Sequence, residues 1–186
     1  MLSHGSEVLY FVIASPLIAA GMYTDVAARR IGNRLNLAIV VSGVVVHAMI
    51  GGLGGVGSSL AGVGIGLAIL LPFYVMGAMG AGDVKFLAAI GAWTGPAGCL
   101  YALAIGGLLA GVYAGFEVLR SPNRRIHLAH MAMIAGKLTS GRLLDSNYAS
   151  YAQLNGERMS MPCGAFFGLG GLAVLASRML GFGVLR

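Results

Sequence analysis

The chain has 186 residues, of which 58% are hydrophobic and only 10% carry a formal charge. A soluble domain usually has about a quarter of its residues charged, so this composition excludes an ordinary water-soluble globular protein and indicates one that is surrounded largely by lipid. The formal net charge of +6 does not indicate nucleic-acid binding. The basic residues lie in short segments between apolar runs, and no aromatic-basic patch or known binding module accompanies them.

Apolar segments follow one another along the chain. A helix rises about 1.5 Å per residue, so about 20 apolar residues are needed to cross the hydrocarbon layer. The expected spans are residues 7–23, 36–53, 58–79, 84–93, 97–119 and 162–180. The fourth is too short to cross alone unless the bilayer is thin or the helix starts below its surface. We therefore predict an all-α, polytopic membrane bundle of about six transmembrane helices, forming a single domain over residues 1–186.

A long polar connection, residues 120–160, separates the fifth and sixth predicted spans. Within it, apolar residues recur at helical spacing: Leu128, Met131, Ile134, Ala135 and Leu138. This pattern predicts an amphipathic helix that lies on the membrane surface and contacts lipid. A docking face for a partner protein is the alternative interpretation of the same pattern.

The basic residues gather on one side of the predicted bundle. Three follow the first span, one lies beside Asp83 and six lie in the long connection, which places ten of the twelve Lys and Arg residues on that side. The opposite connections, residues 54–57 and 94–96, contain none. By the positive-inside rule the basic side is cytoplasmic, so we expect both chain ends on the other side of the membrane.

Two acidic residues lie at the ends of predicted spans. Asp25 directly follows the first apolar run, and Asp83 lies between the third and the fourth. Carboxylates at a membrane are energetically costly and usually mark function. Two predicted spans separate them, so both are expected at the same face of the membrane, where they are able to form a pair. Two carboxylates that share one proton are a known means of hydrolysing peptides.

The segment before Asp83 is rich in glycine. Gly80 and Gly82 carry no side chains, so another backbone, such as an extended peptide substrate, is able to approach the Asp83 carboxylate closely. The alternative is structural. In that interpretation Asp83 caps a helix that starts at Val84, and the glycines form the preceding turn.

These segments resemble a known family. Gly80-Ala81-Gly82-Asp83 matches the Gly-x-Gly-Asp motif of intramembrane aspartyl proteases, and Val84-Lys85-Phe86 resembles the extension of type IV prepilin peptidases. Residues 24–33 are similar to the first motif of that family, an Asp followed by basic residues and Ile-Pro-Asn, although Gly32 stands in place of the proline. Met161-Pro162-Cys163-Gly164 is similar to a Pro-Tyr-Gly in relatives, with Cys163 in place of the tyrosine.

The resemblance implies that Asp25 and Asp83 are the catalytic aspartates of a prepilin peptidase. Such an enzyme cuts leader peptides from pilin-like precursors at the cytoplasmic face of the bacterial inner membrane, and it needs no cofactor. Larger relatives carry an insertion with paired Cys-x-x-Cys motifs, which is associated with methyltransferase activity. Because this chain has no such insertion, it resembles the small CpaA/TadV-like members that serve Flp-type pili. We expect peptidase activity alone.

Several interpretations stay open. Lys85 either favours the ionised form of Asp83 through its charge or binds a lipid phosphate. His47 stands alone in the second span, so we expect a helix contact and no metal site. A rival interpretation of the whole chain is a small membrane transporter or channel in which Asp83 binds a cation. Another is an assembly subunit that performs no chemistry.

Overall fold

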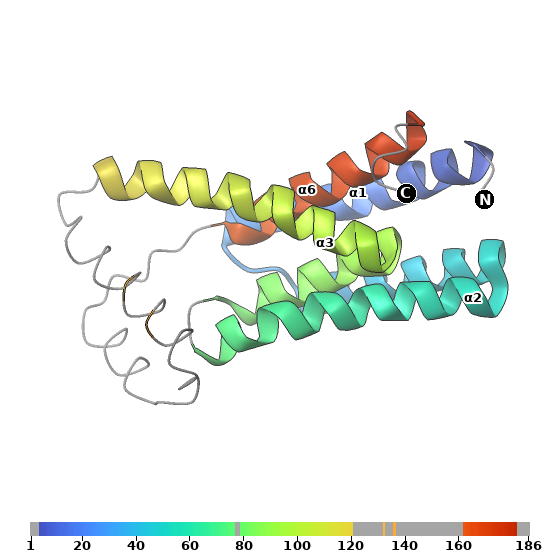
Figure 1. Ribbon diagram of the computed structural model, residues 1–186, viewed down its shortest axis with the longest axis horizontal. Coiled ribbons are helices and arrows are strands. Elements are labelled where there is room, and N and C mark those ends of the chain that lie inside the picture. Colours follow the sequence, from blue (N-terminus) through green and yellow to red (C-terminus); the bar gives the residue numbers. More distant parts are fainter. Residues whose placement is uncertain (1–3, 77–78, 121–131, 133–135, 137–161, 182–186) are drawn as a thin grey trace.

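The computed structural model describes residues 4–76, 79–120, 132, 136 and 162–181, and Figure 1 shows their arrangement. The regular elements of these residues are all helices, which confirms the all-α prediction. They are α1 (His4–Ala28), α2 (Asn33–Val75), α3 (Ala81–Arg120) and α6 (Cys163–Met179). The amphipathic helix predicted within residues 120–160 lies outside the described residues, apart from Arg120 and two isolated positions.

Two of the helices fold back on themselves at a glycine. Gly52 in α2 has φ 57° and ψ −142°, and Gly95 in α3 has φ 69° and ψ −175°. Positive φ values of this kind favour glycine, because a Cβ atom strains the backbone there. The helical backbone is interrupted at each of these glycines, and Figure 1 shows that α2 and α3 each reverse direction along their length. Helix α2 therefore has a first arm, residues 33–51, and a second arm, residues 53–75. Helix α3 has a first arm, residues 81–94, and a second arm, residues 96–120.

The expected count of six separate helices is not confirmed, because the described part of the chain contains four. The two bends fall close to boundaries that hydropathy had placed between predicted spans. Helices α1, α2 and α3 are each long and apolar enough to cross a membrane, whereas α6 has only 17 residues. The number of crossings stays a prediction.

The first arm of α3 is the centre of the bundle. Val84 and every residue from Phe86 to Gly95 are buried, as is expected of a helix that is apolar on all sides. The Trp93 Nε1–H donates a hydrogen bond of 2.9 Å to the Ile39 carbonyl of α2. The Phe86 ring lies against Gly21 of α1 and Gly168 of α6. The segment that is too short to span alone is thus the one that the other helices surround.

Glycines allow the second arm of α2 to approach this central arm closely. A Cβ atom at Gly62 would collide with the backbone carbonyl of Gly91, and one at Gly66 would lie 2.8 Å from the Cα atom of Ala88. In lipid, helices associate through close van der Waals packing rather than the hydrophobic effect. These contacts account for some of the glycines. Others, such as Gly64, have nothing within 4 Å.

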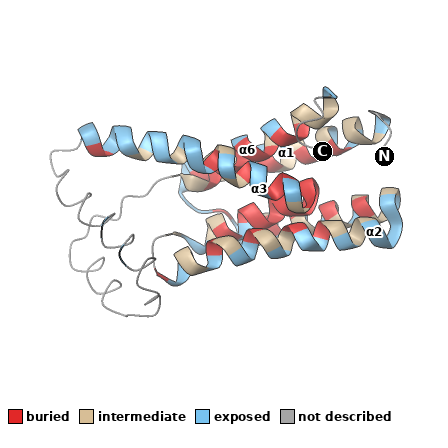
Figure 2. Cartoon of the chain, viewed as in Figure 1, coloured by how far each residue is buried: buried red, intermediate tan, exposed pale blue. Residues whose placement is uncertain are grey.

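Outside this core, the helices present large apolar side chains to their surroundings. Leu53 is 91% exposed and Met49 is 81% exposed. Figure 2 shows buried residues on the inward faces and exposed residues on the outward faces of the helices. Such a surface suits lipid better than water. It supports the prediction that the chain is a membrane protein.

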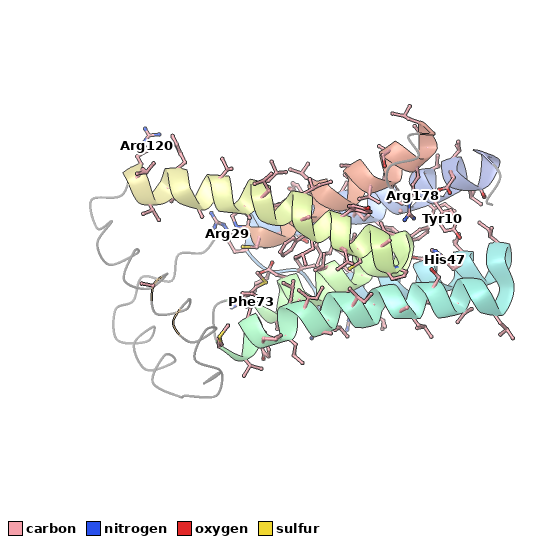
Figure 3. The ribbon with its side chains drawn as sticks, in the orientation of Figure 1. Tyr10, Arg29, His47, Phe73, Arg120 and Arg178 are labelled. Carbon is pink, nitrogen blue, oxygen red and sulfur yellow. The ribbon has the colours of Figure 1, made fainter. Side chains whose placement is uncertain are left out.

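The two ends of the bundle differ in their polar residues. Figure 3 places Arg29 and Arg120 toward one end, and Tyr10, His47 and Arg178 toward the other. Helix α1 runs from the second end to the first, and α6 runs back beside it (Figure 1). The end of α1 therefore lies beside the beginning of α6. This arrangement determines the position of the candidate site.

We predict that Gly62→Ala destabilises the bundle by about 1–3 kcal/mol, because the added methyl group overpacks the contact with the Gly91 backbone. The measurement is the thermal unfolding midpoint in detergent. Gly64→Ala is the matched control, since Gly64 lies on the same arm, is exposed and faces open space. Alanine favours a helix over glycine by about 1 kcal/mol, so the control should equal or exceed the parent. Equal midpoints for the two variants would contradict the packing described here.

Candidate active site

Asp25 lies in the last turn of α1 and is only 5% exposed. Its Oδ2 atom accepts a hydrogen bond of 2.9 Å from the backbone N–H of Ala165, which lies 140 residues further along the chain. The first backbone N–H groups of a helix have no partner within the helix. At the start of α6, Pro162 provides no side-chain cap. The Asp25 carboxylate therefore caps α6 from a different helix.

Asp83 lies in the first turn of α3 and is partly buried. The helix begins at Ala81, and the Gly80 carbonyl accepts a hydrogen bond from the Val84 N–H. The interpretation of Asp83 as the cap of a helix starting at Val84 is therefore wrong, because Gly80 occupies the capping position. The Asp83 Oδ2 atom lies 3.3 Å from the position that a Cβ atom would take at Gly80.

The two carboxylates meet at Gly164 of α6. A Cβ atom at Gly164 would lie 3.0 Å from Asp25 Oδ2 and 3.1 Å from Asp83 Oδ1. The two oxygen atoms are therefore no more than 6.1 Å apart, the sum of those two distances. The backbone N–H of Gly164 interacts with both carboxylates. The structure thus brings Asp25 and Asp83 together, and we refer to them as the carboxylate pair.

The two glycines of the Asp83 motif have different surroundings. Gly80 is exposed, so the backbone beside Asp83 is open at this residue. Gly82 is partly buried and faces Ile31, whose backbone nitrogen lies 3.7 Å from the position of a Cβ atom at Gly82. A Cβ atom at Gly82 would therefore make an ordinary van der Waals contact with Ile31. The proposed approach of a substrate backbone stays a prediction for both glycines.

Lys85 is exposed and donates a hydrogen bond of 2.9 Å from its Nζ atom to Asn33 Oδ1. This bond ties the beginning of α3 to the beginning of α2. It gives Lys85 a structural role that the sequence did not indicate. Its two predicted roles, at Asp83 and at lipid phosphate, stay predictions.

The contribution of α6 to the site was not predicted from the sequence. Gly164 and Ala165 contact the carboxylate pair, and the Ile31 Cδ1 atom lies 2.6 Å from the position of a Cβ atom at Gly164. Backbone N–H groups leave no mark in a sequence. The one available signal was Gly164 at the end of the Met-Pro-Cys-Gly segment. The preceding residue, Cys163, is partly buried and interacts electrostatically with both carboxylates.

His47 lies at the other end of the bundle, as Figure 3 shows. Its Nδ1 atom is 3.0 Å from the Gly43 carbonyl oxygen, and its ring centroid is 4.7 Å from that of Tyr10. Among the residues that the structure describes, no three His, Cys, Asp or Glu side chains are grouped as metal ligands.

The sequence profile of the type IV leader peptidase family matches residues 11–115. Comparison with curated proteins and with solved structures gives no match. The matched region is more than half of the chain and contains both Asp25 and Asp83. The chain therefore belongs to the type IV leader peptidase family.

Proposed function

We propose that this protein is an aspartic endopeptidase that removes the leader peptide from Flp-type pilin precursors, with Asp25 and Asp83 as its catalytic pair. The observation that carries the proposal is the meeting of the two carboxylates, at most 6.1 Å apart, beside Gly164. The membership of a leader peptidase family supports the class of reaction and of substrate. The absence of paired Cys-x-x-Cys motifs from the sequence is consistent with peptidase activity alone.

The geometry is suited to the activation of water. One water molecule that makes two hydrogen bonds of about 2.7–2.8 Å bridges oxygens that are up to about 5.5 Å apart. Most of the range of separations that the 6.1 Å limit allows therefore lets one water molecule contact both carboxylates. Like charges at short distance oppose a second ionisation, so the proposed mechanism uses the pair in the state in which the two carboxyl groups share one proton. One Asp is then a base and the other an acid.

Hydrolysis proceeds in two balanced steps. The ionised Asp takes a proton from water, the water oxygen bonds to the scissile carbonyl carbon, and the protonated Asp gives its proton to the carbonyl oxygen. In the second step the C–N bond breaks. The leaving nitrogen takes the proton held by the first Asp, and the second Asp recovers a proton from the tetrahedral intermediate. Both carboxyl groups return to their starting state, so no cofactor is consumed.

The position of the pair suits a substrate that is half in the membrane. Asp25 lies in the last turn of α1 and Asp83 in the first turn of α3, where apolar helices meet polar connections. A pilin-like precursor has a polar leader joined to an apolar helix. We propose that the apolar helix stays among lipids and protein helices, while the junction lies extended beside the exposed backbone at Gly80.

We further propose that each arm of α2 and α3 crosses the membrane, which with α1 and α6 gives six spans. The carboxylate pair then lies at the cytoplasmic boundary of the bacterial inner membrane. The side chains of Arg29 and Arg120 lie toward the end of the bundle at which α1 finishes (Figure 3), in agreement with the positive-inside rule. Anionic lipid headgroups are the expected neighbours of these residues.

Replacing either catalytic Asp should abolish processing. Asp25→Asn and Asp83→Asn each remove a carboxyl group that is able to exchange a proton, so each variant should lose at least about 1,000-fold in kcat. The double variant should lose no more than the singles, because the two residues act as one unit. The measurement is precursor cleavage in membranes that contain equal amounts of each variant. Glu117→Gln, an exposed residue in the last turns of α3, is the control and should cleave normally. Near-normal cleavage by either Asp variant would remove that residue from the mechanism.

The proposed topology predicts which positions react with a membrane-impermeant maleimide. In a background whose two native cysteines are replaced by alanine, Ala28→Cys and Ala81→Cys should react only from the cytoplasmic side. Leu53→Cys and Ala97→Cys, which lie at the two bends, should react only from the opposite side. All four residues are exposed. Reaction of Ala28→Cys and Ala81→Cys from different sides of the membrane would contradict the pairing of Asp25 with Asp83.

A further inference from the structure

The surroundings of the two carboxylates are not equivalent. Asp25 Oδ2 receives the Ala165 N–H at 2.9 Å and also interacts with the N–H of Gly164. An N–H group only donates, so this oxygen must offer a lone pair. Donation to an ionised acceptor is stronger than donation to a neutral one. The beginning of a helix also carries partial positive charge, which favours an anion there. This effect acts on both carboxylates, because Asp83 lies in the first turn of α3, so the hydrogen bond from Ala165 is what distinguishes Asp25.

Charged side chains add to the difference. Arg29, one turn beyond Asp25 on α1, acts on that carboxylate with its positive charge. Repulsion between the two carboxylates opposes a second ionisation of the pair as a whole and favours neither residue, while backbone N–H groups of Gly164 and Gly80 act on Asp83 in the opposite sense. Cys163 of α6 interacts electrostatically with both carboxylates. The Lys85 ammonium group of α3 is hydrogen bonded to Asn33.

Gly164 is confined on three sides. Its missing Cβ atom would lie 3.0 Å from Asp25 Oδ2, 3.1 Å from Asp83 Oδ1 and 2.6 Å from Ile31 Cδ1. The residue itself is buried. Any side chain at this position therefore displaces a carboxylate or the Ile31 side chain, which lies in the connection before α2. Glycine at this position allows the first turn of α6 to pack directly against both carboxyl groups.

We propose that the first turn of α6 assigns the roles within the pair. The N–H groups of Ala165 and Gly164 hold Asp25 ionised as the base, Asp83 carries the proton as the acid, and Gly164 is a positioning residue for both. This inference rests on the proposed peptidase function and goes beyond it. The peptidase function requires only that the two carboxylates lie close together. The proposal adds that Asp25 is the base and Asp83 is the acid, and that the backbone N–H groups of α6 cause this difference.

Replacement of the amide bond that ends at residue 165 by an ester tests the assignment. Lactic acid at position 165, introduced by nonsense suppression, removes the N–H donor to Asp25 and leaves the methyl side chain unchanged. Loss of one hydrogen bond to a charged acceptor, about 1.5–3 kcal/mol, should move the acidic limb of the pH profile of kcat/KM upward by about one to two pH units. The alkaline limb should not move, because Asp25 is ionised on both sides of it. Lactic acid at position 61, an exposed alanine in the second arm of α2, makes the same change from amide to ester away from the carboxylate pair and should leave both limbs in place.

Each other outcome overturns the assignment. Movement of the alkaline limb would mean that Asp25 carries the proton. A uniform loss of activity at every pH, or no change at all, would mean that the α6 hydrogen bond only stabilises the fold. Failure of the proposed function itself has a different signature: the parent protein would not cleave the precursor, or Asp25→Asn would cleave it as the parent does.

A second variant tests the positioning role. Gly164→Ala should lower kcat by about tenfold or more, with KM for the precursor nearly unchanged, because the methyl group separates reacting carboxylates without touching the rest of the substrate site. Gly111→Ala, at an exposed position with nothing within 4 Å, makes the same chemical change and should have parental kcat. Folding of both variants is checked by the thermal midpoint in detergent. Normal kcat in a folded Gly164→Ala protein would refute the positioning role, and if Gly164→Ala does not fold, the ester at residue 165 decides the proposal.

Discussion

The hydrogen bond from the Ala165 N–H to the Asp25 carboxylate joins two parts of the chain that are 140 residues apart. It fixes the last turn of α1 against the first turn of α6 and supplies the capping partner that Pro162 does not provide. Ala165 is buried, and a buried backbone N–H group without a hydrogen-bond partner is energetically costly. The same contact places the Asp25 carboxylate beside Gly164, and the Asp83 carboxylate lies beside the same residue. The contact that holds α1 against α6 is therefore also the contact that brings the two carboxylates together.

The second constraint is the burial of the first arm of α3. This arm carries Asp83 at its beginning and is surrounded by α1, α2, α6 and its own second arm. Close contacts at Gly62 and Gly66 hold it against α2, and Phe86 lies between Gly21 and Gly168. Because these contacts hold the central arm in place, they also determine where Asp83 lies in the bundle. The position of a reacting carboxylate is thereby determined by packing far from the reaction itself.

Hydropathy alone predicted an all-helical membrane protein, and the parity of the spans predicted that Asp25 and Asp83 lie at one face. Both inferences use patterns that are local in the sequence. The positive φ values of Gly52 and Gly95 were not predicted, because hydropathy gives the boundary of an apolar run and not the backbone conformation of one glycine. Gly95 does lie in a predicted connection and precedes Pro96, which is a local turn signal. The role of Ala165 could not be predicted from the sequence, for another reason. Its contribution is a backbone N–H, which every residue except proline has, and its partner is distant along the chain.

The central claim is that the Asp25 and Asp83 side chains lie within a few ångströms of each other in the membrane. It is tested most directly by cross-linking a protein that carries Asp25→Cys and Asp83→Cys, in a background without native cysteines, using a short bifunctional methanethiosulfonate. Rapid formation of the internal cross-link is the expected result. A control with Leu53→Cys in place of Asp25→Cys should form none, because Leu53 lies at the bend of α2. Equal yields from the two pairs, or no cross-link between positions 25 and 83, would contradict the account.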